Sequence, residues 1–222
     1  GSTGSGKSTL ISLIPRFYDV TDGKITIDGK DIRNVSQHEL REKLGYVPQK
    51  AVLFSGDIAS NILYGNPEGS EAEMTEAATI AQATEFIEQK KKKYKSTISQ
   101  GGSNVSGGQK QRLSIARAIA KHPDVYIFDD SFSALDYKTD ATLRAKLKEK
   151  TSESTVMIVA QRISTILHAD QIIVLDDGQI VGKGTHKELL KTCEAYYQIA
   201  SSQLSEKELE EDLKEVESYA KR

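Results

Sequence analysis

Short apolar, β-branched runs alternate along the chain with stretches whose apolar positions recur at helical spacing. Strands are predicted at residues 24–28, 44–48, 125–129, 155–160, 171–176 and 179–181. Helices are predicted from near residue 7 and at 36–43, 71–89, 106–121, 138–150 and 186–200. The runs at 125, 155 and 171 are nearly all apolar, which is typical of strands covered on both faces. Strands alternating with helices predict the α/β class with a largely parallel sheet.

Two regions depart from this alternation. Residues 51–121 contain no convincing strand and are interpreted as a helical insertion. Residues 201–222 are dense in Glu and Lys, and their apolar residues form one narrow stripe at helical spacing: Leu209, Leu213, Val216 and Ala220. The sequence leaves open whether this tail is a solvated helix or pairs with the tail of a partner. We therefore expect one main domain over 1–200, with a helical subdomain at 51–121, and a charged helical extension over 201–222.

Composition limits the class of protein without selecting a function. The 222 residues suffice for one well-buried domain, and the net charge of −2 gives no strong field that would attract nucleic acid or an anionic membrane. The single Cys193 excludes an internal disulfide, and no apolar run is long enough to span a bilayer. Any role in a membrane is therefore expected to come from another domain or partner.

The first eight residues match the phosphate-binding pattern G-x-x-x-x-G-K-[ST]: Gly1, Ser2, Thr3, Gly4, Ser5, Gly6, Lys7 and Ser8. Glycines let successive backbone N–H groups turn inward around phosphates, and Thr9 extends the motif into the following helix. Lys7 supplies a cation for the β- and γ-phosphates, and Ser8 offers a hydroxyl to Mg²⁺. ATP and Mg²⁺ are thus the expected ligands. Because a strand should precede such a loop, we expect the chain to be part of a longer protein.

Carboxylates follow the apolar strand predicted at 125–129. Asp129 ends that strand, on the edge of an α/β sheet where ligands bind, and is predicted to lie on the Mg²⁺ side. Gln49 follows the strand at 44–48 and can reach Mg²⁺ or the attacking water. Asp130 stands where hydrolysis would favour glutamate. Its side chain is one methylene shorter, so its oxygen retracts by roughly 1 Å, which can cost on the order of 100-fold in rate.

A second glycine-rich helix start lies at Ser106, Gly107, Gly108 and Gln109. Ser106 and Gln109 form a capping box, but the two glycines cost helix stability. Their presence is explained if a ligand phosphate approaches the backbone closely. The chain then has two anion sites, which favours a head-to-tail dimer with each ATP between the phosphate loop of one chain and the glycine-rich helix of the other.

With these motifs, the chain resembles the ATP-binding cassette (ABC) family, and the resemblance covers nearly all of residues 1–200. The matching segments are the Walker A loop at 1–8, the Q-loop at Gln49, the signature at 105–109, the Walker B strand ending at Asp129 and the D-loop ending at Asp136. Segments 52–58, 61–65 and 182–190 are similar to exporters. The resemblance implies a P-loop NTPase core of the RecA-like kind with a helical signature subdomain. It also implies a nucleotide contact for Asp136. A transmembrane domain is expected upstream, and the segment at 49–54 would contact it at the cytoplasmic face of the cell membrane.

Two positions depart from the family pattern in one composite site. Exporters usually carry glutamate at the position of Asp130 and a switch histidine at the position of Gln161. Glutamine can hydrogen-bond to a γ-phosphate but cannot become a cation or relay a proton. Beside an intact signature, this pair resembles the degenerate subunit of a heterodimeric exporter. We therefore expect tight ATP binding with slow hydrolysis at this chain's own site, catalysed by Lys7, Asp130 and Gln161.

Three alternatives stay open at this point. The chain could be a fully active homodimeric exporter ATPase that tolerates Asp130 and Gln161. It could be a cassette without a transport role that acts on DNA or ribosomes, although no heptad run separates Lys7 from Asp129. It could also be another P-loop phosphotransferase, which would have no use for the segment at 106–109. The expected partner is a different cassette with an intact glutamate and histidine, and no nucleic acid partner is expected.

Overall fold

The computed structural model describes residues 1–219 and divides the chain into two compact units. The first unit joins Gly1–Ser12 to Val159–Arg222, and the second is Leu13–Ile158. The phosphate loop therefore belongs to one unit, and the carboxylates and the signature belong to the other. Each unit is described by itself.

The second unit is built on a sheet of three strands in the order β3-β6-β7. Strands β3 (Leu44–Val47) and β6 (Val125–Asp129) are parallel, with Leu44 opposite Val125, which agrees with the predicted largely parallel sheet. Strand β6 is buried at every position, as its apolar run predicted. Strand β7 (Thr155–Val159) is only half-buried along most of its length, so the prediction of cover on both faces is wrong there.

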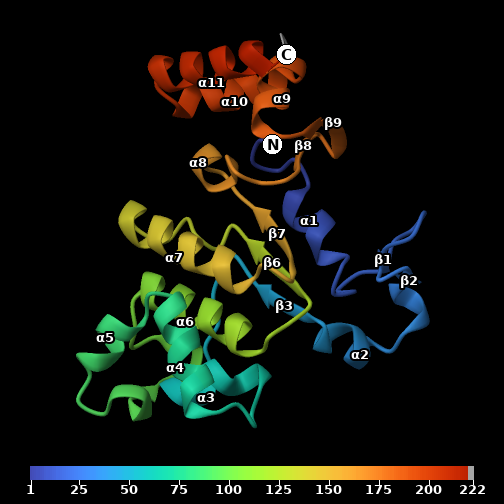
Figure 1. The fold of residues 1–222 in the computed structure, drawn as a ribbon. Coiled ribbons are helices and arrows are strands. Elements are labelled where there is room, and N and C mark those ends of the chain that lie inside the picture. Colours follow the sequence, from blue (N-terminus) through green and yellow to red (C-terminus); the bar gives the residue numbers. More distant parts are fainter. Residues whose placement is uncertain (220–222) are drawn as a thin grey trace. The chain divides into compact units, whose positions relative to one another are not determined.

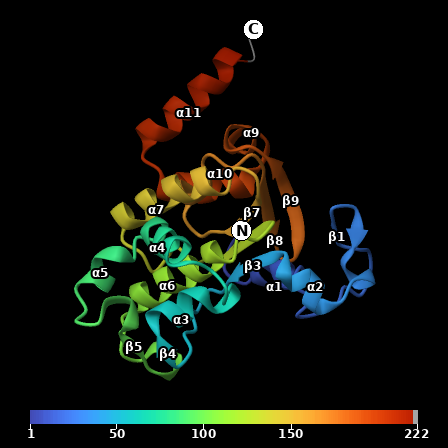
Figure 2. The same cartoon turned by 60° about the horizontal axis from the view of Figure 1, so that its bottom comes forward.

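Helices gather beside this sheet in the second unit. Helices α3, α4, α5 and α6 lie together in both ribbon views (Figures 1 and 2), and Figure 2 shows the short strands β4 (Gly56–Asp57) and β5 (Thr97–Ile98) near α3. The helices are α2 (Gln37–Glu42), α3 (Ile58–Ile62), α4 (Glu71–Ile80), α5 (Thr84–Glu88), α6 (Gly107–Ala120) and α7 (Tyr137–Lys150). The 3-10 turns are η1 (Ile32–Asn34), η2 (Leu63–Gly65), η3 (Lys93–Lys95) and η4 (Gln100–Gly102). The helices predicted at 36–43, 106–121 and 138–150 are thereby confirmed.

Three predictions in this unit are wrong in detail. The helix predicted at 71–89 is broken between α4 and α5, where Gln82 adopts a left-handed φ of 58°. Residues 51–121 do contain strands, since β4 (Gly56–Asp57) pairs antiparallel with β5 (Thr97–Ile98). The strand predicted at 24–28 shortens to β1 (Thr26–Ile27), which forms a hairpin with β2 (Lys30–Asp31). Both pairs are only two residues long, too short for a periodic signal.

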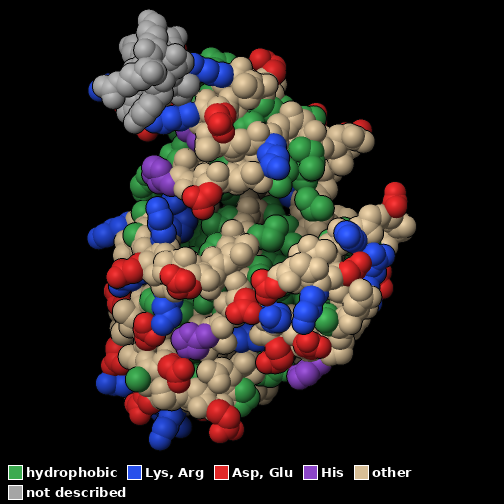
Figure 3. Space-filling view, turned by 45° about the vertical axis from the view of Figure 1, so that its right-hand side comes forward, with side chains coloured by type: hydrophobic (Ala, Val, Ile, Leu, Met, Phe, Trp, Pro, Cys, Tyr) green, Lys and Arg blue, Asp and Glu red, His purple; other side chains and the backbone are tan. Residues whose placement is uncertain are grey.

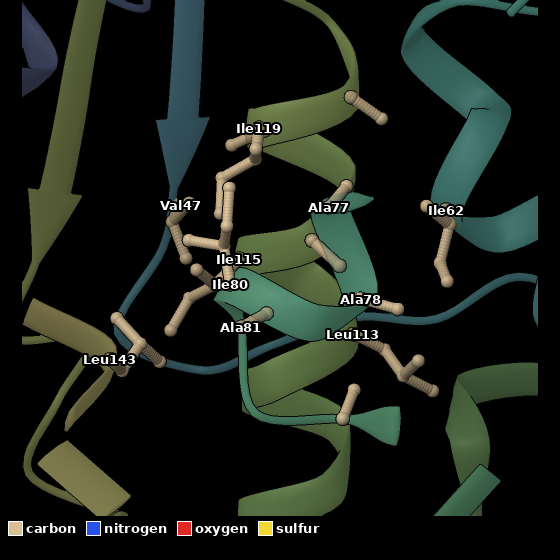
Figure 4. Packing of buried hydrophobic residues seen from close by; sticks show 14 of the residues in the cluster. Val47, Ile62, Ala77, Ala78, Ile80, Ala81, Leu113, Ile115, Ile119 and Leu143 are labelled. Carbon is tan, nitrogen blue, oxygen red and sulfur yellow. The ribbon is translucent and has the colours of Figure 1, made fainter. Parts of the chain in front are cut away.

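The core of this unit forms where α6 packs against α4 and the sheet (Figure 4). Leu113, Ile115 and Ile119 of α6 are fully or almost fully buried. Ala77 and Ala78 of α4 are as deeply buried, and their small side chains let the two helices approach closely. The core therefore fixes α6 firmly, and with it the glycine-rich segment at which α6 begins.

Up to residue 219, the first unit contains α1 (Lys7–Ser12), a hairpin of β8 (Ile172–Asp176) and β9 (Gln179–Gly184), and four further helices. These are α8 (Ile163–Ile166), α9 (His186–Thr192), α10 (Glu194–Gln203) and α11 (Glu206–Tyr219). The helix predicted at 186–200 is interrupted at Cys193, whose φ and ψ of −129° and 102° are extended. Strand β8 exposes 46% of Ile173, so it too is not covered on both faces.

The charged tail packs on its own unit through α11 (Figure 1). Leu209 is buried, and Leu213 packs against the same apolar cluster as α9 and α10. His186, itself buried, bonds through Nδ1 to the Tyr196 hydroxyl at 2.8 Å and through Nε2 to Asp212 at 3.1 Å. The inner half of the predicted stripe thus contacts this chain; the side chain of Val216 and residue Ala220 lie outside what the structure describes.

The surface mixes charges of both signs. Acidic and basic side chains are interspersed over the face drawn in Figure 3. No helix among residues 1–219 combines the length and apolar character needed to cross a bilayer.

Candidate functional site

The phosphate loop adopts a conformation that needs its glycines. Gly4 and Gly6 have φ values of 81° and 95°, in the left-handed region that residues with a Cβ atom rarely adopt. Gly1 is required for space, because a Cβ there would lie 2.1 Å from the Leu175 carbonyl oxygen. The loop is also tied to the β8–β9 turn, since the Gly178 amide donates to the Ser5 carbonyl at 3.2 Å.

Lys7 lies over the loop that precedes it. Its Nζ donates to the carbonyl oxygens of Gly1 and Ser2, both at 2.7 Å, and to Ser5 Oγ at 3.3 Å. Ser5 is buried, whereas Ser2, Thr3, Gly4, Ser8 and Thr9 are exposed. The exposed loop residues and the Lys7 ammonium therefore lie together at the start of α1.

The end of β6 carries two buried carboxylates. Asp129 and Asp130 are 6% and 8% exposed. Asp130 has a left-handed φ of 48°, a conformation that aspartate tolerates better than most residues, and its carboxylate accepts a hydrogen bond from Gln49 Nε2 at 3.2 Å. Two residues predicted at the site, 81 positions apart in sequence, are thus brought into contact.

Neighbours fix the backbone around these carboxylates. The Ser131 hydroxyl donates to the Val47 carbonyl at 2.9 Å, and the Ser133 hydroxyl donates to the Asp130 carbonyl at 3.0 Å. Burial, together with the nearby charge of Asp129, raises the pKa of Tyr46. The phenol therefore stays protonated at neutral pH beside the carboxylate.

The glycine-rich start of α6 confirms the predicted capping box. Ser106 Oγ accepts from the Gln109 amide at 3.2 Å, and Gln109 Oε1 accepts from the Ser106 amide at 3.2 Å. The φ of neither Gly107 nor Gly108 is left-handed, and a Cβ on Gly107 would meet nothing within 4 Å. On Gly108 it would meet only the Ala134 carbonyl oxygen at 3.4 Å, an ordinary contact distance. Within its own unit, the chain shows no reason for glycine at either position.

Asp136 begins α7 as a helix cap. Its carboxylate accepts from the Thr139 hydroxyl at 2.6 Å and from the Thr139 amide at 2.9 Å, and these bonds lower its pKa. The structure thus shows a local function for this carboxylate, and the predicted nucleotide contact stays a prediction.

Gln161 follows β7 in an exposed position. Its carbonyl accepts a hydrogen bond from Gln203 Nε2 at 2.8 Å, a partner that the sequence did not indicate. Gln161 shares the first unit with the phosphate loop, whereas Gln49, Asp129 and Asp130 belong to the second unit with the signature. The predicted magnesium set of Ser8, Gln49 and Asp129 is therefore divided between the units, and the catalytic and ligand assignments stay predictions.

Known proteins similar to this chain agree on one family. A family described as ABC transporter matches residues 1–133. An uncharacterized ABC transporter ATP-binding protein of Mycobacterium tuberculosis is 49% identical over 206 residues, covering 91% of this chain and 35% of the relative. A protein of Staphylococcus aureus, provisionally named a multidrug export ATP-binding/permease protein, is 45% identical over 203 residues with the same two coverages. The chain thus spans about a third of the length of these curated relatives.

A solved structure shows the same fold. It is a bacterial Atm1-family ABC exporter with ATP bound, 40% identical in sequence, with a TM-score of 0.89 over 93% of this chain and 36% of that one. This similarity confirms the predicted P-loop fold with a parallel sheet and helical content. The chain belongs to the ABC transporter family and is an ATP-binding domain homologous to those of ABC exporters.

Proposed function

We propose that this chain is the ATP-binding motor domain of an ABC exporter and works as one half of a pair. Each ATP is held between the phosphate loop of one domain and the glycine-rich helix start of the other. The observation that carries this proposal is the unexplained pair Gly107 and Gly108, where neither backbone conformation nor packing within the unit calls for glycine. A ligand that approaches this backbone from outside the chain supplies the reason.

The phosphate loop fits a triphosphate by its donors. The ammonium of Lys7 donates to loop carbonyls, and phosphate oxygens are stronger acceptors that can replace them. Ser8, Gln49 and Asp129 offer a hydroxyl, an amide oxygen and a carboxylate, which are the hard oxygen ligands that suit Mg²⁺. When bound, Mg²⁺ neutralises charge on the phosphate oxygens. Lys7 and the signature of the partner do the same from the protein side.

Asp130 is the residue that would orient the attacking water. Its carboxylate is held by Gln49 at 3.2 Å, so the glutamine both positions it and competes for its oxygen. Because aspartate is one methylene shorter than glutamate, this carboxylate reaches less far. Together with the neutral Gln161, this supports slow hydrolysis at the chain's own site, while its intact signature completes a faster site on a different partner.

An exposed aromatic pair supports docking to a membrane part. Phe54 and Tyr64 are 41% and 59% exposed and stack with ring centroids 4.4 Å apart. Arg117 lies 5.0 Å from the Phe54 ring, and burial lowers its pKa to about 10. An exposed apolar pair that includes Phe54, the last residue of the segment at 49–54, suits the predicted contact with a transmembrane domain at the cytoplasmic face of the membrane.

The test compares ATP turnover by this protein alone, by the mixed pair, and by the pair whose partner lacks its catalytic glutamate. We expect little turnover alone, robust turnover in the mixed pair, and slow residual turnover in the third case. Robust turnover by this protein alone would instead support a homodimeric exporter ATPase that tolerates Asp130 and Gln161.

A further inference from the structure

We propose that Gln203, the last residue of α10, is a positioning residue that holds Gln161 in place for ATP hydrolysis. Its side-chain amide joins two backbone groups on either side of Arg162. Nε2 donates to the Gln161 carbonyl at 2.8 Å, and Oε1 accepts from the Ile163 amide at 2.8 Å. A carbonyl can only accept and an amide N–H can only donate, so this pair of contacts fixes the orientation of the Gln203 amide.

The contact to Ile163 replaces a missing helix cap. Ile163 begins α8, and the first N–H groups of a helix have no partner within it. Arg162 stands at the cap position but makes no side-chain capping bond. Gln203 therefore supplies the acceptor from 40 residues further along the chain, and the start of α8 is set by α10.

Buried neighbours hold both ends of this connection. Tyr196 and Ala200 anchor α10 in the apolar cluster of the first unit, and Ile163 is 3% exposed in the same cluster. Gln161 and Gln203 themselves are exposed. Substituting Gln203 thus leaves the core intact while releasing the peptide that carries the Gln161 side chain.

Both bonds together restrict the backbone at Gln161, and a displacement of about 1 Å at a catalytic group can cost much of its effect. This inference depends on the proposed contact of Gln161 with the γ-phosphate. It adds that the junction of α10 and α11, where the chain turns away at Leu204, determines how well that contact is made.

The experiment uses the full-length protein assembled with its partner, with the catalytic glutamate of the partner neutralised so that turnover reports this chain's site. Gln203→Leu removes both bonds, and we expect kcat to fall roughly three- to tenfold, as for the loss of one or two neutral hydrogen bonds. KM for ATP and Tm should change little. Gln198→Leu is the matched control, because Gln198 is exposed on the same helix and its side-chain amide donates to Glu194 at 3.0 Å.

Two further variants separate positioning from a structural effect. Gln203→Glu keeps an acceptor for the Ile163 amide but loses the donor to Gln161, so we expect it to lose most of the activity that Gln203→Leu loses. In a Gln161→Ala background, Gln203→Leu should cause no further loss, because it acts through Gln161. Recovery with glutamate, or independent additive losses, would overturn the inference.

The outcomes also separate this inference from the proposed function. If Gln161→Ala alone leaves hydrolysis unchanged, the proposed role of Gln161 is wrong and the inference is overturned with it. If Gln161→Ala lowers hydrolysis but Gln203→Leu behaves like Gln198→Leu, only the positioning role of Gln203 is overturned.

Discussion

The phosphate loop at residues 1–8 and the helix start at 106–109 are both rich in glycine, but the chain explains only the glycines of the loop. Gly4 and Gly6 have left-handed φ values, and a side chain at Gly1 would collide with the Leu175 carbonyl. Gly107 and Gly108 have neither property. The glycines of the loop are therefore explained by its own conformation, whereas those of the helix start fit the proposed approach of a ligand phosphate from outside the chain.

The largest expected effect comes from Gly6→Val in the loop. A β-branched residue at a φ of 95° forces the loop to rearrange, so we expect ATP affinity to fall roughly 100-fold even without a partner, with a lower Tm. Isothermal titration with ATP measures the change. Gly29→Val is the matched control, because Gly29 has a φ of 77° in the β1–β2 turn and open space around it. Equal loss of ATP affinity in both variants would show that strain alone, rather than the phosphate loop, is responsible.

The same substitution in the signature should act only on the assembled pair. Gly108→Val adds side-chain atoms where a partner's nucleotide is proposed to approach, and we expect turnover of the pair to fall on the order of 100-fold. ATP binding by this protein without its partner should be unchanged, and Tm should change little. A comparable loss of ATP affinity in the unpaired protein would contradict the division between the two glycine-rich segments.

The sequence predicted the elements that carry a strong local signal. The apolar run of β6 and the capping box at Ser106 both depend on patterns within short segments. Tertiary contacts decided what the sequence missed. The break at Gln82 is held by Arg112, which donates to its carbonyl at 2.8 Å from α6, and such a contact leaves no periodic trace.

The same distinction holds for the candidate site, where the sequence predicted some residues and missed others. Motif residues such as Lys7 and Asp129 were found because their types and spacing are fixed by phosphate chemistry. Gln203 was missed because its partners lie 40 and 42 residues away and its own position, at the end of an ordinary helix, carries no signal. The local function of Asp136 as a helix cap was also missed, although Asp before a helical run is a common start signal.

A smaller effect is expected at Asp130 and Gln161, the two positions predicted to differ from exporters. Asp130→Glu with Gln161→His restores a longer carboxylate and a residue that can carry a proton, so we expect hydrolysis at this chain's own site to rise about tenfold. Single-turnover hydrolysis, with the partner's catalytic glutamate neutralised, measures it. Asp130→Asn, paired with the same neutralised partner, is the control that removes the negative charge at position 130. An unchanged rate in the double variant would contradict the proposal that these two positions slow hydrolysis.

The smallest effect should come from Asp136. Like the glycines of the phosphate loop, this residue has a structural role within the chain, because it caps α7. Bonds from Thr139 lower the pKa of this carboxylate below its ordinary value of 3.8. Its contribution to stability is therefore complete above that value and lost as pH falls through the lower pKa of the folded state. We expect Asp136→Ala to lower Tm by about 2 to 4 °C at neutral pH and by less at pH 3. Asp136→Asn retains an acceptor for the Thr139 amide, so it should keep most of the Tm but lose the pH dependence. A large loss of turnover in both variants, measured well below their Tm, would show that the carboxylate also contacts the nucleotide. Asp136 would then resemble Gly107 and Gly108, whose proposed role depends on a partner.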